Sequence, residues 1–256
     1  MSGSAGAHAV GAHWVKAALQ VNPFGYVGRS SPSKAFADEA AYNTAILDRC
    51  VAEGIDLIAV TDHWCIDTAR SLIDAATPLG IAALPGFEAN SAEGIHLLVL
   101  FELGTDFADI NAAIGVCGAT PGCVNGTTGD PFKDILHAMD ERGALVIPAH
   151  ANVANSGMLT GRNGPPLVKM VTHQDLHAIA ITPGQPEASD QEAICNGRKP
   201  FDRVHPVSVI YADDISRPDA LAQPGATTWF KVNSLRLDSL SLPYALRRRE
   251  SPLTTR

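Results

Sequence analysis

Long apolar stretches are missing from this sequence of 256 residues. The longest runs, such as 55–60 and 96–101, are far shorter than the roughly 20 apolar residues that a membrane-spanning helix needs. The first ten residues also lack the basic segment and the apolar core of a secretory signal peptide. We therefore expect a soluble, cytoplasmic protein without a membrane partner.

Positive charge is also scarce, because 19 Lys and Arg residues face 27 Asp and Glu residues, for a net charge of -8. This net negative charge disfavours nonspecific electrostatic binding of nucleic acid but is compatible with a local basic pocket. The five cysteines form no CxxC pair. In a chain of this size we expect them to be reduced and mostly structural.

Several catalytic motifs are absent. The sequence contains no GxSxG, no GxGxxG after a strand and no GxxxxGK[ST], so serine hydrolase, dinucleotide-binding and P-loop functions lack support. Internal repeats and a convincing linker are missing as well. We expect one domain over residues 1–256, with flexible segments at 1–12 and 247–256.

What the sequence does contain is an alternation of short runs rich in Val, Ile and Leu with segments of helical periodicity, which is typical of βα units. Helices are predicted over 36–53 and 131–141, each followed by a glycine. Two Gly-rich loops, 115–129 and 151–166, are long enough to be functional or mobile. A mainly parallel (β/α) barrel accommodates the predicted strands. They cover 14–21, 56–61, 80–84, 96–101, 144–148, 178–182, 206–211 and 227–232.

Polar residues accompany one predicted strand after another. In parallel α/β folds reactive side chains gather at the carboxyl ends of strands, and buried acids and imidazoles there are costly unless they bind something. Imidazole nitrogens with carboxylate oxygens suit zinc, manganese or iron. Asp62 is an exception, because its neighbour His63 points to the opposite face if the strand continues, and Asp62 then only braces the backbone or a ligand. The candidate site residues are His63, Glu88, His96, His150 and Asp213.

A single histidine at a strand end is more often a hydrogen-bonded structural residue than a ligand. The prediction of a metal site therefore depends on the combination of three strand-associated histidines with two carboxylates. The remaining histidines lie in helical, polar or terminal contexts, and we leave them outside the site. They are His8, His13, His137, His173, His177 and His205.

In these segments the sequence resembles the PHP family, the polymerase and histidinol phosphatase superfamily. The similar motifs are IAVTDHW, GFEAN, GIHLL, IPAHAN and YADDIS, and the resemblance runs through most of the chain. It is closest to PHP modules of proteins that carry an SMC-like ATPase, whose final segment resembles ADDISRPDALAQPGATTWFKV. The resemblance implies a distorted (β/α)7 TIM-like barrel with a trinuclear metal site. It also implies that Glu88 is a bridging carboxylate. In the enzyme hypothesis, His63 or Asp213 handles protons or a second ion.

The first motif departs from the family pattern. Where the family has Asp-Leu-His-x-His-Thr, this chain has KAALQVNPF, so Gln20 and Asn22 replace the imidazoles and Ala18 replaces the acid. The last motif lacks its usual second histidine, and Ile215 lies at or near that position. Amide oxygens bind transition metals more weakly than imidazole does. We expect Glu88, His96 and His150 to hold one ion, and Asp213 with Gln20 and Asn22 to form a weaker, oxygen-rich site.

The function that follows is hydrolysis of a phosphate ester by a metal-activated water, with zinc or manganese as the expected divalent metal and iron or magnesium as alternatives. The substrate is expected to be a phosphorylated small molecule or a nucleic-acid end. Arg162 in the second Gly-rich loop is a candidate for binding the phosphate. Two alternatives remain: a catalytically inactive PHP-like binding or regulatory module, and a fragment that works with an ATPase domain or partner chain.

Overall fold

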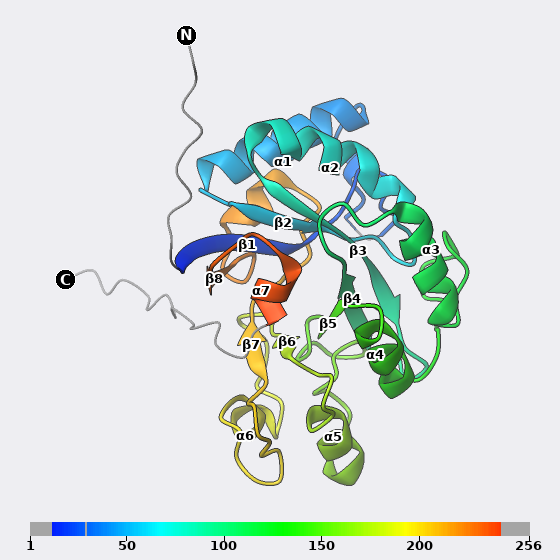
Figure 1. Cartoon of the computed structure of the whole chain (residues 1–256), viewed down its shortest axis with the longest axis vertical. Helices are drawn as coiled ribbons and strands as arrows, with labels where there is room; N and C mark the ends of the chain where they lie inside the picture. Colours follow the sequence, from blue (N-terminus) through cyan, green and yellow to red (C-terminus); the bar gives the residue numbers. More distant parts are fainter. Residues whose placement is uncertain (1–11, 29, 242–256) are drawn as a thin grey trace, which may run out of the picture.

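The structure, a computed structural model, describes residues 12–28 and 30–241 (Figure 1). The α-helices are α1 (Glu39–Ala52), α2 (Arg70–Ala76), α3 (Phe107–Val116), α4 (Phe132–Asp140), α5 (Gly164–Val171), α6 (Gln191–Cys195) and α7 (Leu237–Ser241). The strands are β1 (His13–Val21), β2 (Leu57–Val60), β3 (Ala82–Asn90), β4 (His96–Leu100), β5 (Leu145–Pro148), β6 (Ala178–Ala180), β7 (Ser208–Ile210) and β8 (Thr228–Val232). No helix among these residues is long and apolar enough to cross a membrane.

All eight predicted strands are confirmed, and α1 and α4 confirm the two predicted helices. The Asp38 side chain caps α1 by accepting a hydrogen bond from the Ala41 N–H at 2.8 Å. Gly54 follows the helix with a φ of 63°, a conformation that glycine adopts without strain. The predicted flexible segments, 1–12 and 247–256, lie outside the described residues except for Ala12.

Strand β3 is longer than the sequence predicted. The predicted strand covers 80–84, but β3 continues through Pro85 and Gly86 to Asn90. Up to Pro85 the strand pairs in parallel with β2, and from Gly86 onward it pairs antiparallel with β4. A Cβ atom on Gly86 would lie 2.6 Å from the Val99 carbonyl oxygen, so glycine permits this close approach. The Pro-Gly pair therefore marks a change of partner within one strand.

The strands form two sheets. The larger is a curled, mixed sheet in the order β5-β4-β3-β2-β1-β8, and the smaller pairs β6 with β7 in parallel. Near the site a few backbone hydrogen bonds connect the segments that follow the strands of the two sheets. The Ala151 N–H donates to the Ala180 carbonyl at 2.7 Å, the Asn22 N–H donates to the Ile215 carbonyl at 2.8 Å, and the Ile215 N–H donates to the Gln20 carbonyl at 2.9 Å. Because β6 and β7 have only three residues each, these contacts do not extend into ladders. The described strands thus make an open, curled half-barrel in place of the predicted (β/α)7 barrel.

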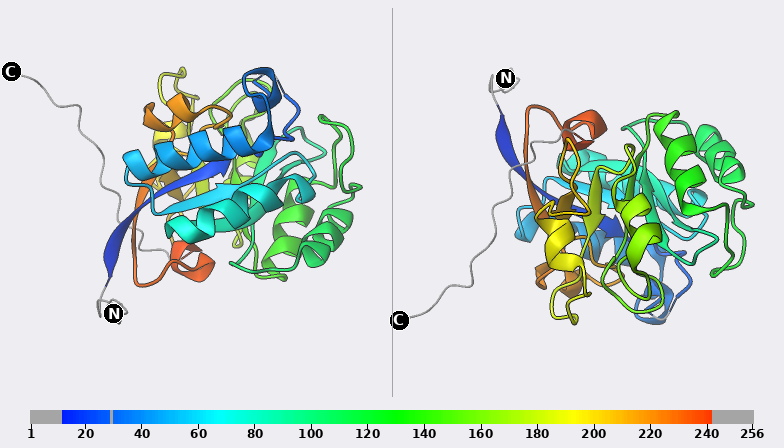
Figure 2. Two further views of the ribbon diagram at one scale, coloured as in Figure 1. Left: turned by 90° about the horizontal axis from the view of Figure 1, so that it is seen from above. Right: turned by 90° about the horizontal axis from the view of Figure 1, so that it is seen from below.

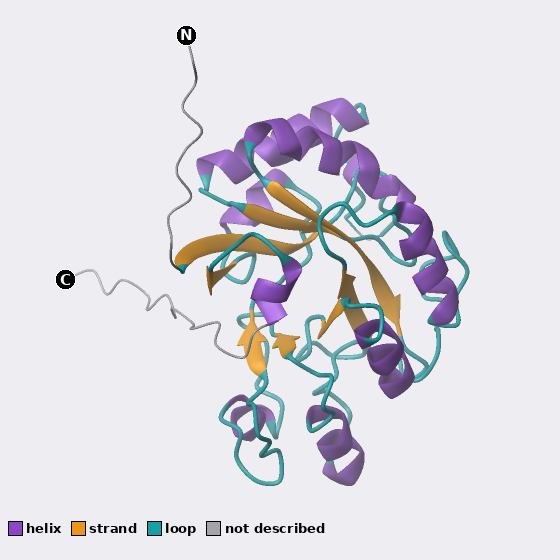
Figure 3. Cartoon of the chain, in the orientation of Figure 1, coloured by secondary structure: helices purple, strands orange, loops and turns teal. Residues whose placement is uncertain are grey.

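Side chains alternate between two apolar cores. Ile58 and Val60 of β2 face the outer core beneath the helices, whereas Leu57 and Ala59 face the inner core. Helices α1 to α4 follow the outer side of the curved sheet (Figures 1 and 3). From above, α1 and α2 lie side by side over the strands (Figure 2). The helices cover the outer face of the sheet, whereas the polar side chains described below lie at the edge where β1, β2 and β5 end.

Candidate metal centre

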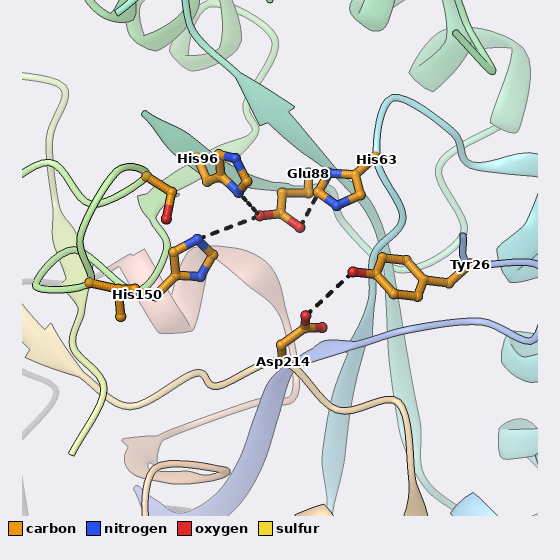
Figure 4. A pocket seen from close by; sticks show the side chains of 8 residues that line it. Tyr26, His63, Glu88, His96, His150 and Asp214 are labelled. Carbon is orange, nitrogen blue, oxygen red and sulfur yellow. Dashed lines mark hydrogen bonds and ion pairs between the residues drawn. The ribbon is translucent and has the colours of Figure 1, made fainter. Parts of the chain in front are cut away.

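A pocket of about 420 Å³ opens at the edge where β1, β2 and β5 end and β4 begins (Figure 4). Four residues that the sequence singled out line it together with four that it did not. The lining residues are Tyr26, His63, Glu88, His96, His150, Val153, Ser156 and Asp214. Every predicted histidine of the site therefore reaches the same pocket.

Strand direction explains why His96 belongs to this edge. Since β4 runs antiparallel to β3, its first residue, His96, pairs with Asn90 at the end of β3. Glu88 lies two residues before Asn90, and its N–H donates to the Asp62 carbonyl at 2.8 Å. The Trp64 N–H donates in turn to the Glu88 carbonyl at 3.1 Å, which fixes His63 between them. Backbone pairing thus brings His63, Glu88 and His96 together.

Two residues at the site have unusual backbone conformations. His150 has a φ of 32° and Trp64, directly after His63, has a φ of 49°. Positive φ values strain side chains of this size, and such strain is maintained by the surrounding structure. The Ala149 N–H donates to the His96 carbonyl at 2.9 Å, and the Trp64 indole N–H donates to the Thr127 carbonyl at 2.7 Å. These contacts of the neighbouring residues Ala149 and Trp64 help to keep the imidazoles of His150 and His63 at the pocket.

Glu88 lies at the centre of the cluster and is only 2% exposed. Its Oε1 is 2.7 Å from Nδ1 of His96 and 3.9 Å from Nε2 of His150, and its Oε2 is 3.5 Å from Nδ1 of His63. Burial opposes ionisation of Glu88, but the hydrogen bond with His96 and the surrounding imidazoles outweigh it and lower the pKa of Glu88 to about 2. The carboxylate is therefore ionised at neutral pH.

The two ligand imidazoles titrate differently. Burial lowers the pKa of His96, but the hydrogen bond and charge of Glu88 reverse the effect and raise it. For His150 burial dominates over the attraction of Glu88, and its pKa is lowered. His150 is thus the more readily neutral of the two, as a metal ligand must be.

The arrangement of Glu88, His96 and His150 fits a divalent metal ion. One donor atom from each lies within 4.8 Å of the other two. Oε1 of Glu88 lies 2.7 Å from Nδ1 of His96 and 3.9 Å from Nε2 of His150. These two separations lie on either side of the roughly 3.3 Å that would separate neighbouring donors around a tetrahedral ion with bonds of about 2.0–2.1 Å. Three protein ligands leave a coordination place open toward the pocket.

Gln20 and Asn22 lie beside this cluster and are both fully buried. Gln20 Nε2 donates to Glu88 Oε2 at 3.2 Å, and Asn22 Nδ2 donates to Ser216 Oγ at 2.7 Å and to the Asp214 carboxylate. The amide oxygens, Gln20 Oε1 and Asn22 Oδ1, have no hydrogen-bond partner. Buried acceptors without a donor are costly, and a hard cation satisfies such oxygens.

The structure turns Asp214, rather than the predicted Asp213, toward the pocket. Asp213 accepts a hydrogen bond from Thr182 Oγ1 at 2.7 Å and does not line the pocket. Asp214 lies at the pocket wall, where its partly buried carboxylate accepts a hydrogen bond from Tyr26 Oη at 3.5 Å. Packing around its carboxylate, followed by the charge of Glu88, raises the pKa of Asp214. Asp213 and Asp214 are adjacent in the sequence, and no sequence pattern indicates which of the two side chains faces the pocket.

Tyr26 is a pocket residue that sequence reasoning missed. Its ring stacks on His63 with the centroids 5.6 Å apart. A Cβ atom on Gly28 would lie 2.4 Å from the Tyr26 hydroxyl, so glycine leaves the space that this ring occupies. Burial and the nearby Asp214 raise the pKa of Tyr26, and the hydroxyl keeps its proton. No spacing rule links this loop tyrosine to the strand ends.

Two further predictions have a clear structural outcome. Asp62 accepts hydrogen bonds from the His63 N–H at 2.8 Å and from Thr68 Oγ1 at 2.9 Å. With these contacts Asp62 braces the backbone beside His63.

Arg162, the predicted phosphate-binding residue, donates to the carbonyls of Gly157 and Thr160 at 2.9 and 3.1 Å, and also to the Glu93 carbonyl. Its guanidinium binds the loop that contains it and is not among the groups that line the pocket.

No protein-family model matches the chain, and no curated protein matches it. Several solved structures are similar to this chain in their fold. A two-domain protein from Bacteroides vulgatus containing a predicted PHP-like metal-dependent phosphoesterase is similar with a TM-score of 0.58 and 15% identity, over 89% of this chain and 61% of that one. The lesion-specific endonuclease PfuEndoQ from Pyrococcus furiosus is similar with a TM-score of 0.60 and 12% identity, over 90% and 55%.

PsfC from Pseudomonas syringae is similar over more of its own length, with a TM-score of 0.53 and 16% identity over 92% of this chain and 89% of PsfC. By contrast, the chain spans about three-fifths or less of the length of the other two proteins. At these identities the similarity shows the fold: a mixed α/β architecture shared with a PHP-like protein.

Proposed function

We propose that this chain is a metal-dependent phosphoesterase of the PHP superfamily, in which Glu88, His96 and His150 hold a divalent ion. The observation that supports it most is the convergence of these three donors on one pocket. The names of two structural neighbours, a predicted PHP-like metal-dependent phosphoesterase and an endonuclease, support the same class of chemistry. The imidazole-rich donor set favours zinc or manganese.

When bound, a divalent ion polarises a phosphoryl oxygen and lowers the pKa of water. The residues of the chain supply the rest. Glu88 orients His63 through the contact at 3.5 Å, so the imidazole of His63 is placed to accept a proton at the pocket wall. On the opposite wall, Asp214 has a raised pKa and is placed to hold a proton for the leaving oxygen. We assign to Asp214 the role predicted for Asp213.

A second, weaker cation position is proposed at the amide oxygens of Gln20 and Asn22, on the side away from the amide nitrogens that donate to Glu88 and Asp214. The unpartnered amide oxygens support it, and their oxygen chemistry suits magnesium or manganese. Nothing in the similarities described above bears on an SMC-like ATPase, so an ATPase domain or partner chain stays a prediction. The experiment described next distinguishes the phosphoesterase from the alternative, an inactive binding module.

Removal of metal tests the proposal. Protein purified without chelator is expected to contain at least one equivalent of zinc, manganese or iron by elemental analysis. Dialysis against a chelator should abolish hydrolysis of chromogenic phosphoesters, and adding back the ion should restore it. His96→Ala should lose metal, whereas His137→Ala, a histidine on α4 with a 62% exposed side chain, should keep it. A metal-free protein that stays folded and hydrolyses nothing would indicate a binding module.

Metal affinity should fall as the pH is lowered. Because Glu88 raises the pKa of His96 above its ordinary value of about 6.5, protons compete with the ion as the pH falls through that raised pKa. We expect affinity to drop about tenfold per pH unit for each proton displaced, with His150 contributing only at lower pH because its pKa is lowered. Competition with a chromogenic chelator between pH 8 and 6 measures this. A flat profile would mean that neither imidazole binds the ion.

A further inference from the structure

We infer that a zinc ion binds outside the pocket, at a site formed by His137, His173 and Asp175. His137 lies on α4, and the other two residues lie in the segment 172–177 between α5 and β6. None of the three lines the pocket described above. The inference therefore goes beyond the proposed function and does not depend on it.

The carboxylate of Asp175 is the group that points to a ligand. Its side chain is only 9% exposed, and one of its oxygens, Oδ2, has no hydrogen-bond partner. A buried acceptor without a donor is costly, and buried carboxylates are generally paired or bind a metal ion. A cation at Oδ2 would compensate this oxygen.

Two imidazoles face the same oxygen. Nδ1 of His137 is 3.5 Å from Oδ2 of Asp175, and Nδ1 of His173 is 3.8 Å from it. Both separations exceed the roughly 2.7–2.9 Å of a charge-assisted hydrogen bond. The Asp175 N–H donates to Nδ1 of His173 at 3.4 Å, so this nitrogen acts as an acceptor and has no proton to give to Oδ2. A cation joins two such acceptors, whereas a hydrogen bond between them is impossible.

The donor set suits zinc. Imidazole nitrogen and carboxylate oxygen bind this ion with bonds of about 2.0–2.2 Å, which places neighbouring donors of a tetrahedral ion roughly 3.3 Å apart. The separations of 3.5 and 3.8 Å from Oδ2 are slightly longer. His137 can turn toward an ion because its side chain is 62% exposed. Three protein ligands leave the fourth coordination place for water.

The segment that carries Asp175 is held in place from behind by Arg203. The guanidinium donates to the carbonyls of Val171, Gln174 and Leu176 at 3.1, 3.1 and 2.6 Å. Asp175 attracts this guanidinium but accepts no hydrogen bond from it at Oδ2. Arg203 therefore fixes the backbone on both sides of Asp175 and leaves Oδ2 available to an ion.

An ion at this position would connect the two sheets. Helix α4 leads into β5 of the larger sheet, and the segment 172–177 leads directly into β6 of the smaller one. Because few backbone hydrogen bonds connect the two sheets near the pocket, a ligand shared by α4 and this segment should stabilise the fold. The site is thus structural, and its occupation should leave the pocket unchanged.

A zinc titration of the whole chain in competition with a chromogenic chelator tests the inference. Wild type should bind one equivalent more than Asp175→Asn or His173→Ala, each of which should weaken this equivalent at least about tenfold. His177→Ala is the matched control from the same segment and should bind like the wild type, since its imidazole faces Asp140 at 3.9 Å. Zinc at about 100 times Kd should raise the Tm of wild type by roughly 5 °C.

His137→Ala decides the question if Asp175→Asn does not fold, because removing an exposed side chain leaves the fold intact. This variant should lose the same equivalent of zinc and the rise in Tm, and should keep the ion at Glu88, His96 and His150. If the three ligand variants bind as much zinc as the wild type, with the same affinity, the inference is overturned. A wild type whose Tm does not respond to zinc would overturn the structural role.

Discussion

Replacing Glu88 by glutamine is expected to abolish phosphoester hydrolysis and to weaken metal binding by about 100-fold or more. Glutamine keeps the size of the side chain, and its single amide oxygen can still accept a hydrogen bond from either His96 or Gln20. The substitution removes the second acceptor oxygen and the negative charge at the centre of the cluster. Loss of residues that only orient metal ligands already costs about 10- to 100-fold in affinity or activity, so loss of a charged ligand should cost at least as much. Elemental analysis and a metal titration of the purified variant measure the effect.

The matched control is Glu141→Gln, at the end of α4, where the glutamate side chain is 63% exposed. This variant should keep both metal and activity. Circular dichroism and thermal melting in the presence of chelator should show that Glu88→Gln and the wild type have similar folds. If Glu88→Gln retains a full equivalent of metal, the three-residue centre is wrong, and the ion binds elsewhere in the chain.

Gly157→Ala is expected to destabilise the protein by about 3 kcal/mol, near the upper end of the range for overpacked sites. A Cβ atom there would lie 2.3 Å from the Ala151 carbonyl oxygen and 2.5 Å from the Val153 carbonyl oxygen. These are backbone atoms, which cannot swing aside as a flexible side chain can. For a chain of this length the loss corresponds to a drop in Tm of roughly 10 °C, measurable by scanning calorimetry.

The same substitution should also weaken metal binding, because the affected loop begins at His150 and supplies Val153 and Ser156 to the pocket. Gly115→Ala is the control: Gly115 lies in α3, and a Cβ atom there meets nothing within 4 Å. Its Tm should stay the same or rise slightly, since alanine favours a helix over glycine. A Gly157→Ala variant that melts with the wild type would show that this loop relaxes freely.

The strands, and the sheet edge at which the candidate site residues meet, were predictable because both depend on local patterns. Runs of Val, Ile and Leu bury on both faces of a covered sheet, and the strand ends then place His63 and His150 at one edge without knowledge of the packing. His96 was predicted from its position at the start of a strand. The mixed order of the sheet was not predictable, because the change of partner at Pro85 and Gly86 depends on β4, a later segment.

The sequence by itself determined the residue types available for chemistry: the carboxylate of Glu88, the imidazoles of His63, His96 and His150, and the amides of Gln20 and Asn22. Tertiary structure alone decided which of two neighbouring aspartates faces the pocket, and it added Tyr26. The physical reason is that the alternation of side chains holds only inside regular strands. Strand β7 ends at Ile210, so the direction of Asp214 is fixed by its contacts with Asn22 and Tyr26, residues almost 200 positions earlier in the chain.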